Sequence, residues 1–183
     1  MSISDLSGSM EIDGYHGTDS RSACRILKDQ AFRISNSNKE WLGSGIYFYL
    51  EYVDAAEWSM KQRKTDSPVV VMAHICVTDD KYLDLDTEKG NYMMHKAMDI
   101  LEQNNLVVKN VIDNKEGDVT ASINQCNLAN MIWILAPHLS MLISTFPEGR
   151  SKGKFIKDIR RYRREICIRD NSCIKNIRLC QII

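Results

Sequence analysis

The chain has 183 residues, of which 44% are hydrophobic, so it is long enough and apolar enough to bury the core of one domain. Its 24 lysines and arginines balance its 24 aspartates and glutamates, which gives a formal net charge of zero at pH 7. This balance excludes an overall field that would draw the whole molecule onto nucleic acid or an anionic membrane, so any electrostatic targeting must be local.

The six cysteines form no Cys-x-x-Cys pair and have no histidine at zinc-finger spacing, and the first ten residues lack a signal-peptide pattern. We therefore expect a reduced protein of the cytoplasm with no metal site. Residues 1–11 are predicted to be a flexible tail and residues 12–183 a single domain. The long apolar stretch 128–146 contains Asn130 and Pro137, which favours a buried core segment over a membrane span.

In chain order, the first predicted element is a strand that ends near His16. A helix follows, for which Asp19 or Ser20 offers an N-cap. The polar segment 32–41 is predicted to be a surface loop that leads into a short strand over 45–49. A further helix is predicted over 53–64, and its spacing would place the side chains of three apolar residues on its buried face: Val53, Ala56 and Met60.

The second half of the chain mixes helices and strands. Its predicted elements are a buried strand over 69–77, an amphipathic helix around 94–101, a helix over 127–136 that is broken near Pro137 and followed by a short element, and strands over 165–168 and 177–183. These elements show no regular β-α-β rhythm. The sequence therefore predicts an α+β fold.

Three short motifs, far apart in the sequence, suggest one active site. They are Tyr-His-Gly-Thr over 15–18, Leu-Gly-Ser-Gly-Ile-Tyr-Phe over 42–48 and Glu-Ile-Cys-Ile-Arg-Asp over 165–170. In type and order they resemble the NAD-binding core of the ADP-ribosyltransferases, in the subgroup that includes diphtheria toxin and the poly-ADP-ribose polymerases. The resemblance extends over residues 15–60 and 165–174, whereas the residues between match only loosely.

The resemblance implies a fold with two packed, mainly antiparallel small sheets flanked by helices. It also implies that His16, Gly17 and Thr18 bind NAD as substrate. Cleaving the bond between nicotinamide and ribose creates an oxocarbenium-like centre, so the site must hold the ring still and place negative charge near the ribose. As an alternative, His-Gly-Thr is also an ordinary strand-to-helix turn, because short motifs have many false positives.

Two aromatic residues and one carboxylate complete the implied site. Gly45 would let the backbone turn and present Tyr47 to the flat nicotinamide, and Trp58 would close an aromatic sandwich from the other side. Glu165 would bind the ribose and stabilise the developing positive charge, which makes His16, Tyr47 and Glu165 the implied catalytic set. The alternatives are that Trp58 fills the core and that Glu165 is a solvent-facing charge paired with Arg163 or Arg164.

The resemblance also implies that the segment before the third motif contacts the acceptor of ADP-ribose. Glu148 is a candidate there, and eight lysines and arginines lie between residues 150 and 164, among them Arg160 and Arg161. Such a cluster could attract the phosphates of NAD or of a nucleic acid. The alternatives are a turn residue at position 148 and a solvated helix face carrying the basic side chains.

The sequence therefore predicts a mono-ADP-ribosyltransferase that acts on a protein or nucleic-acid acceptor, without metal and without a membrane partner. By resemblance, free-standing domains of this size are often toxins or defence effectors, for which a neutralising antitoxin is a possible partner. Three alternatives stay open: an RNA 2′-phosphotransferase, an NAD glycohydrolase, and a non-catalytic module that binds NAD or ADP-ribose.

Overall fold

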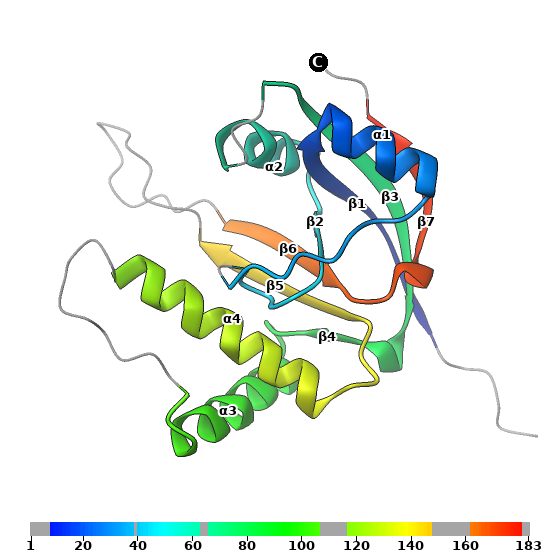
Figure 1. Cartoon of the computed structure of the whole chain (residues 1–183). Coiled ribbons are helices and arrows are strands. Elements are labelled where there is room, and N and C mark those ends of the chain that lie inside the picture. Colours follow the sequence, from blue (N-terminus) through cyan, green and yellow to red (C-terminus); the bar gives the residue numbers. More distant parts are fainter. Residues whose placement is uncertain (1–7, 39, 63–65, 107–116, 148–161, 181–183) are drawn as a thin grey trace, which may run out of the picture.

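The computed structural model describes residues 8–38, 40–62, 66–106, 117–147 and 162–180. Across these ranges, seven strands form one mixed sheet and four α-helices pack around it (Figure 1). The strands are β1 (Ser9–Asp19), β2 (Ile46–Tyr49), β3 (Pro68–Thr78), β4 (Tyr82–Asp84), β5 (Met141–Pro147), β6 (Tyr162–Ile168) and β7 (Ile174–Leu179). The α-helices are α1 (Ser20–Asp29), α2 (Tyr52–Glu57), α3 (Glu88–Gln103) and α4 (Gly117–Leu135). The predicted α+β class is confirmed.

The sheet has the order β4-β5-β6-β2-β1-β3-β7, with β4 parallel to β5 and the other neighbours antiparallel. Strand β1 pairs with β3 along its whole length, but its pairing with β2 is limited to Tyr15 and Tyr49. The prediction of two small sheets is therefore wrong for this chain, because that single pair joins both groups of strands into one sheet. The two groups are nevertheless nearly separate at the β1–β2 junction.

Two hydrophobic clusters pack against the sheet. One cluster packs α1 against β1 and β3 through residues such as Ile26 and Val71. The other packs α3 and α4 against β4 and β5 through residues such as Ile132 and Leu142. In Figure 1, α3 and α4 lie together beside β4 and β5, and α1 lies beside β1, β3 and β7. Ile143 of β5 belongs to the first cluster and its neighbour Leu142 to the second, so the first cluster continues across the β1–β2 junction and β5 is covered on both faces.

The predicted start of α1 is confirmed. The carboxylate of Asp19 accepts a hydrogen bond from the backbone N–H of Ser22 at 2.7 Å, which is the expected N-cap interaction. Along β3, residues 69–73 are all buried, as expected for a β-branched run in the interior of a sheet covered on both faces. The local sequence therefore determines both elements that border the first motif.

The predicted buried face of the second helix is wrong. Val53 and Met60 are 54% and 52% exposed, whereas Asp54, Ala55 and Ser59 are buried. The cause is the close approach of α2 to β1, because a Cβ atom at Gly17 would lie 2.1 Å from the carbonyl oxygen of Ala55. Only small side chains fit at this contact. After α2 the helix continues as one π-helical turn, Trp58–Gln62.

Several predicted boundaries also differ. Strand β1 begins at Ser9, inside the predicted tail, and α4 begins at Gly117, ten residues before the predicted helix start. The short element after Pro137 is strand β5, and the last strand begins at Ile174 instead of residue 177. The described helices include none that is long and apolar enough to cross a membrane. All six cysteines are free thiols.

Candidate active site

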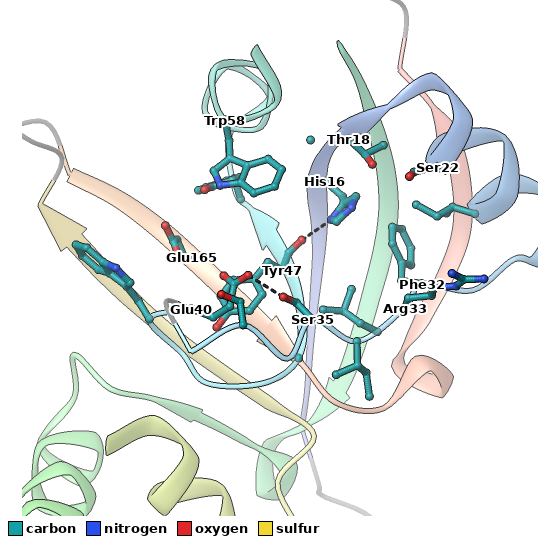
Figure 2. A pocket seen from close by; sticks show the side chains of 18 of the residues that line it. His16, Thr18, Ser22, Phe32, Arg33, Ser35, Glu40, Tyr47, Trp58 and Glu165 are labelled. Atoms are coloured by element: carbon teal, nitrogen blue, oxygen red, sulfur yellow. Dashed lines mark hydrogen bonds between the residues drawn. The ribbon is translucent and has the colours of Figure 1, made fainter. Parts of the chain in front are cut away.

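The site is a pocket of about 730 Å³ at the junction where β1 and β2 share only one residue pair. Its size is within the range of roughly 300–1,000 Å³ that is usual for small-molecule sites. Residues from all three sequence motifs line it (Figure 2). The predicted site residues among its lining are His16, Gly17, Thr18, Gly45, Tyr47, Trp58 and Glu165. Glu148, Arg160 and Arg161 lie outside the described residues.

The ring of His16 is held at the junction between β1 and β2. Its Nδ1 atom lies 2.8 Å from the backbone carbonyl oxygen of Tyr47, and since a carbonyl only accepts, Nδ1 donates the proton of this hydrogen bond. The ring also packs edge-on against Phe32 and Phe48, with centroids 5.1 and 5.9 Å apart. The imidazole therefore has a fixed orientation at the pocket wall.

Beside His16, the next two residues of β1 have different roles. Gly17 leaves the space that α2 needs to approach the strand, which is a packing reason for this glycine in addition to any contact with a ligand. The side chain of Thr18 is only 1% exposed, and its hydroxyl oxygen has no hydrogen-bond partner among the residues that the structure describes. Thr18 also lines the pocket, so its hydroxyl is a candidate contact for a bound molecule.

The hydroxyl of Tyr47 holds a turn in place, while its ring lines the pocket. It donates to the carbonyl oxygen of Gly43 at 2.6 Å and accepts from the backbone N–H of Leu42 at 2.9 Å. Gly43 has a φ of 77°, a left-handed conformation that favours glycine at this point of the turn. Burial raises the pKa of Tyr47 far above its ordinary value, so the phenol stays neutral.

Residues from α4 and from the position directly after β6 support the same turn, which we call the 42–45 turn. The indole N–H of Trp133 donates to the carbonyl oxygen of Leu42 at 3.0 Å. The guanidinium of Arg169 donates to the carbonyl oxygen of Ser44 and to the side-chain oxygen of Asn130, each at 2.8 Å. Arg169 also lies 4.4 Å from the ring centroid of Trp133. The sequence contained no recognisable signal for this support from α4.

Trp58 lies on the opposite side of the pocket from Tyr47. Figure 2 shows its ring projecting from the helix into the pocket, between Glu165 and His16. The helix is attached to β6 by ion pairs, because Nε of Arg163 lies 3.3 Å from the carboxylate of Asp54 and its terminal nitrogen contacts Glu57. Because Glu57 directly precedes Trp58, these ion pairs also fix the position of the Trp58 ring.

Glu165 faces the pocket from β6 and is not a solvent-facing charge. Burial is the largest cause that raises its pKa, to about 7, and the charge of Glu40 raises it further. The charge of Arg163 and a hydrogen bond with the hydroxyl of Tyr49 act in the opposite direction. Arg164 lies on the other face of the strand and pairs with Asp84 and Asp86.

Glu40 is a site residue that sequence reasoning missed. Its carboxylate lines the same pocket and accepts a hydrogen bond from the hydroxyl of Ser35 at 2.7 Å (Figure 2). Burial is the main cause that raises its pKa, and the Ser35 hydrogen bond partly offsets this effect. It lies in the predicted polar loop, where no motif distinguishes it from the neighbouring polar residues.

The pocket therefore has two chemically different sides. In Figure 2, Glu40 and Glu165 lie on one side of Tyr47, and Ser22 and Arg33 lie on the other. Arg25 also lines the pocket. In the described part of the chain, no group of three or more His, Cys, Asp or Glu side chains is placed to hold a metal ion. The arrangement suits an elongated ligand with an anionic part and a part that becomes positively charged.

Comparisons with known proteins identify no family. No family model matches the chain, and no solved structure matches it. The uncharacterized protein MJ0359 of Methanocaldococcus jannaschii is 32% identical over 76 residues. That alignment covers 39% of this chain and 36% of MJ0359, so the similarity is confined to a minor part of both proteins.

Proposed function

We propose that this protein is an NAD-dependent mono-ADP-ribosyltransferase. The observation that supports this function best is the convergence of the three motifs, since His16, Tyr47 and Glu165 come from separate parts of the sequence and line one pocket. Their residue types resemble the NAD site of the ADP-ribosyltransferases. On this proposal the fold is a variant of the ADP-ribosyltransferase fold in which the two groups of strands are joined by one residue pair.

The charges of the pocket indicate how NAD would be oriented. The nicotinamide ring would lie between the rings of Tyr47 and Trp58, which places the adjacent ribose near Glu165. The pyrophosphate would lie toward the side that holds Arg25 and Arg33, because guanidinium groups bind phosphate well. His16 and Thr18, on the wall between these two sides, would contact the sugar groups.

The proposed reaction breaks the bond between the ribose C1′ atom and the nicotinamide nitrogen. As the bond breaks, the pyridinium becomes neutral nicotinamide and positive charge moves to the ribose. The ionised carboxylate of Glu165 would stabilise this charge, which is the electrostatic contribution that matters most in such a step. A macromolecular acceptor, protein or nucleic acid, would then form the new bond to C1′. A role as a toxin or defence effector with a neutralising antitoxin belongs to the same proposal.

A second candidate is an RNA 2′-phosphotransferase. That reaction also uses NAD but requires cations that bind the transferred phosphate, and Arg25 and Arg33 in the pocket are the observation that favours it. Incubation with NAD and an RNA that carries an internal 2′-phosphate distinguishes the two, since only the phosphotransferase removes the phosphate from the RNA.

The decisive experiment measures nicotinamide release from NAD by the purified protein, with and without cell extract that supplies protein and RNA. We expect Glu165→Ala to lower release by about 10²–10³-fold with little change in NAD affinity. Tyr47→Ala should instead weaken NAD binding itself. Label transferred from NAD to protein or RNA identifies the acceptor class, and release into water alone identifies a glycohydrolase. NAD binding without release would leave a non-catalytic module and refute the proposal.

A further inference from the structure

The pocket contains a second carboxylate that the NAD-binding motifs do not include. Glu40 lines the pocket together with Glu165, although it comes from the segment between α1 and β2. Figure 2 shows both side chains on the same side of Tyr47. Two carboxylates in one partly buried pocket are costly, because burial removes their hydration and their negative charges repel each other. Such a pair therefore requires a chemical explanation.

The position of Glu40 is well fixed. Its carboxylate accepts the hydroxyl hydrogen bond of Ser35, and its backbone carbonyl accepts from the N–H of Gly43 at 3.1 Å. Ser35 in turn pairs with Gly45 through two backbone hydrogen bonds, of 2.8 and 3.0 Å. Glu40 is thus linked to the 42–45 turn through its side chain, by way of Ser35, and directly through its backbone, and α4 and Arg169 support this turn. A side chain placed in this way has the preorganisation that catalysis needs.

The charge of Glu40 also affects the protonation of Glu165. The charge of Glu40 is the second largest cause, after burial, that raises the pKa of Glu165 to about 7. Burial raises the pKa of Glu40 as well. A raised pKa makes the carboxylate of Glu40 a stronger base than that of an exposed glutamate, which suits it to accept a proton from a substrate.

The proposed reaction has one proton that must be moved. Nicotinamide leaves as a neutral molecule, so the leaving group needs no proton, and Glu165 is already assigned to the charge on the ribose. An acceptor hydroxyl, however, must lose its proton when its oxygen forms the new bond to C1′. A base on the acceptor side supplies this step, and a contribution of about 10²–10⁴-fold is typical for such a group.

We propose that Glu40 is the general base that deprotonates the acceptor, and that the acceptor is a neutral protic group such as a hydroxyl. This inference rests on the proposed function. The C1′–nitrogen bond breaks and its electron pair stays on nicotinamide, the acceptor oxygen bonds to C1′, and the acceptor proton passes to the carboxylate of Glu40 and then to solvent. An anionic acceptor such as a carboxylate is disfavoured, because it would enter a pocket that already holds two carboxylates.

The test compares nucleophiles that do and do not carry a proton. Wild type, Glu40→Gln, Glu165→Gln and the exposed-carboxylate control Glu51→Gln are each given NAD with methanol in water, or with sodium azide. The glutamine at position 40 keeps an oxygen that can accept the Ser35 hydrogen bond. We expect Glu40→Gln to bind NAD normally and to lose about 10²-fold in methyl ADP-ribose formation.

Azide needs no deprotonation, so it should restore nicotinamide release by Glu40→Gln by about tenfold or more. It should not restore Glu165→Gln, whose defect is in the charge on the ribose, and Glu51→Gln should behave like wild type. With azide, the rate of nicotinamide release should fall at a lower pH in Glu40→Gln than in wild type as the solution is acidified. The reason is that the charge of Glu40 no longer opposes ionisation of Glu165.

The remaining outcomes separate two failures. If wild type releases nicotinamide and Glu40→Gln matches it with methanol, Glu40 is not the base and only this inference fails. If Glu40→Gln is equally impaired with methanol and azide, its role is positional and the base assignment is again wrong. If wild type releases no nicotinamide with water, methanol or azide, the proposed function fails and this inference fails with it.

Discussion

The two walls of the pocket are built in different ways. The β1 wall, made of His16, Gly17 and Thr18, belongs to a strand whose backbone pairs with β3 along its whole length. The acidic wall is made of Glu165, whose strand β6 pairs with β2 and β5, and of Glu40 with the 42–45 turn. This second part depends on side chains, because Tyr47, Trp133 and Arg169 hold the turn by hydrogen bonds to its backbone. The β1 wall is thus positioned by a strand ladder, whereas the part of the acidic wall around Glu40 depends in addition on a few side chains.

This difference indicates where substitutions should act. A backbone ladder survives the loss of a side chain, so changes on the β1 wall should affect ligand binding more than folding. A buried turn that is held by side chains is more sensitive, because removing one of these side chains leaves a polar backbone group without its hydrogen bond. Changes behind the acidic wall should therefore reduce both stability and catalysis, even where they lie outside the pocket.

The largest effect on stability is expected for Arg169→Ala. The variant loses the hydrogen bonds to Ser44 and Asn130 and the contact with the ring of Trp133. We expect a loss of about 2–3 kcal/mol in the free energy of unfolding, measured by urea denaturation, and a fall in nicotinamide release. The exposed Lys175→Ala on β7 is the control and should change neither quantity. An unchanged stability of Arg169→Ala would show that the turn holds without its support.

A smaller effect, of opposite sign, is expected for Glu165→Gln. In the unfolded chain this carboxyl ionises near its ordinary pKa of 4.5, whereas burial and Glu40 raise its pKa in the folded protein to about 7. The folded state thus binds more protons between these values, so its stability falls as the pH rises through this window. Glutamine cannot ionise and avoids this loss.

The free energy of unfolding should be measured by urea denaturation at pH 4.5 and at pH 8. Relative to wild type, Glu165→Gln should be more stable by about 1–2 kcal/mol at pH 8 than at pH 4.5. The same substitution lowers activity, so stability and catalysis would change in opposite directions at one residue. A difference that does not depend on pH would mean that the carboxyl of Glu165 ionises normally in the folded protein.

The fold was predictable from sequence where a local pattern has one structural solution. The strand over residues 69–77 and the cap at Asp19 are such cases, because a β-branched run and an Asx N-cap act within their own segments. The buried face of α2 and of the π-helical turn that follows it was not predictable. It is set by Gly17 of β1, which admits only small residues at the contact and turns Val53 and Met60 outward.

The candidate site was likewise predictable only where its residues stand in a local motif. Tyr47 and Glu165 were recognisable because they stand in motifs with distinctive neighbours, and both line the pocket. Glu40 had no such neighbours, and its position depends on a hydrogen bond to Ser35 and on a turn supported from α4. A single sequence does not reveal contacts between residues as distant as Ser44 and Asn130, so the acidic wall could be assigned only from the structure.

A moderate effect is expected for Tyr47→Phe, which separates the two roles of this residue. The variant loses the hydroxyl that donates to Gly43 and accepts from the buried N–H of Leu42, so we expect a loss of about 1–1.5 kcal/mol in the free energy of unfolding. Its ring still lines the pocket, so NAD affinity measured by calorimetry should stay within about twofold of wild type. A large loss of affinity would mean that the hydroxyl contacts the ligand.

The smallest effect on stability is expected for Thr18→Val, on the β1 wall. The hydroxyl has no hydrogen-bond partner within the described residues, and valine has nearly the same shape, so the free energy of unfolding should change by less than about 0.5 kcal/mol. If the hydroxyl contacts NAD, the dissociation constant should rise by about 3–10-fold, measured by calorimetry. Binding would then change without stability, the reverse of the pattern expected for Tyr47→Phe. A clear loss of stability would instead mean that the hydroxyl has a structural role, and the β1 wall would depend on its side chains as the acidic wall does.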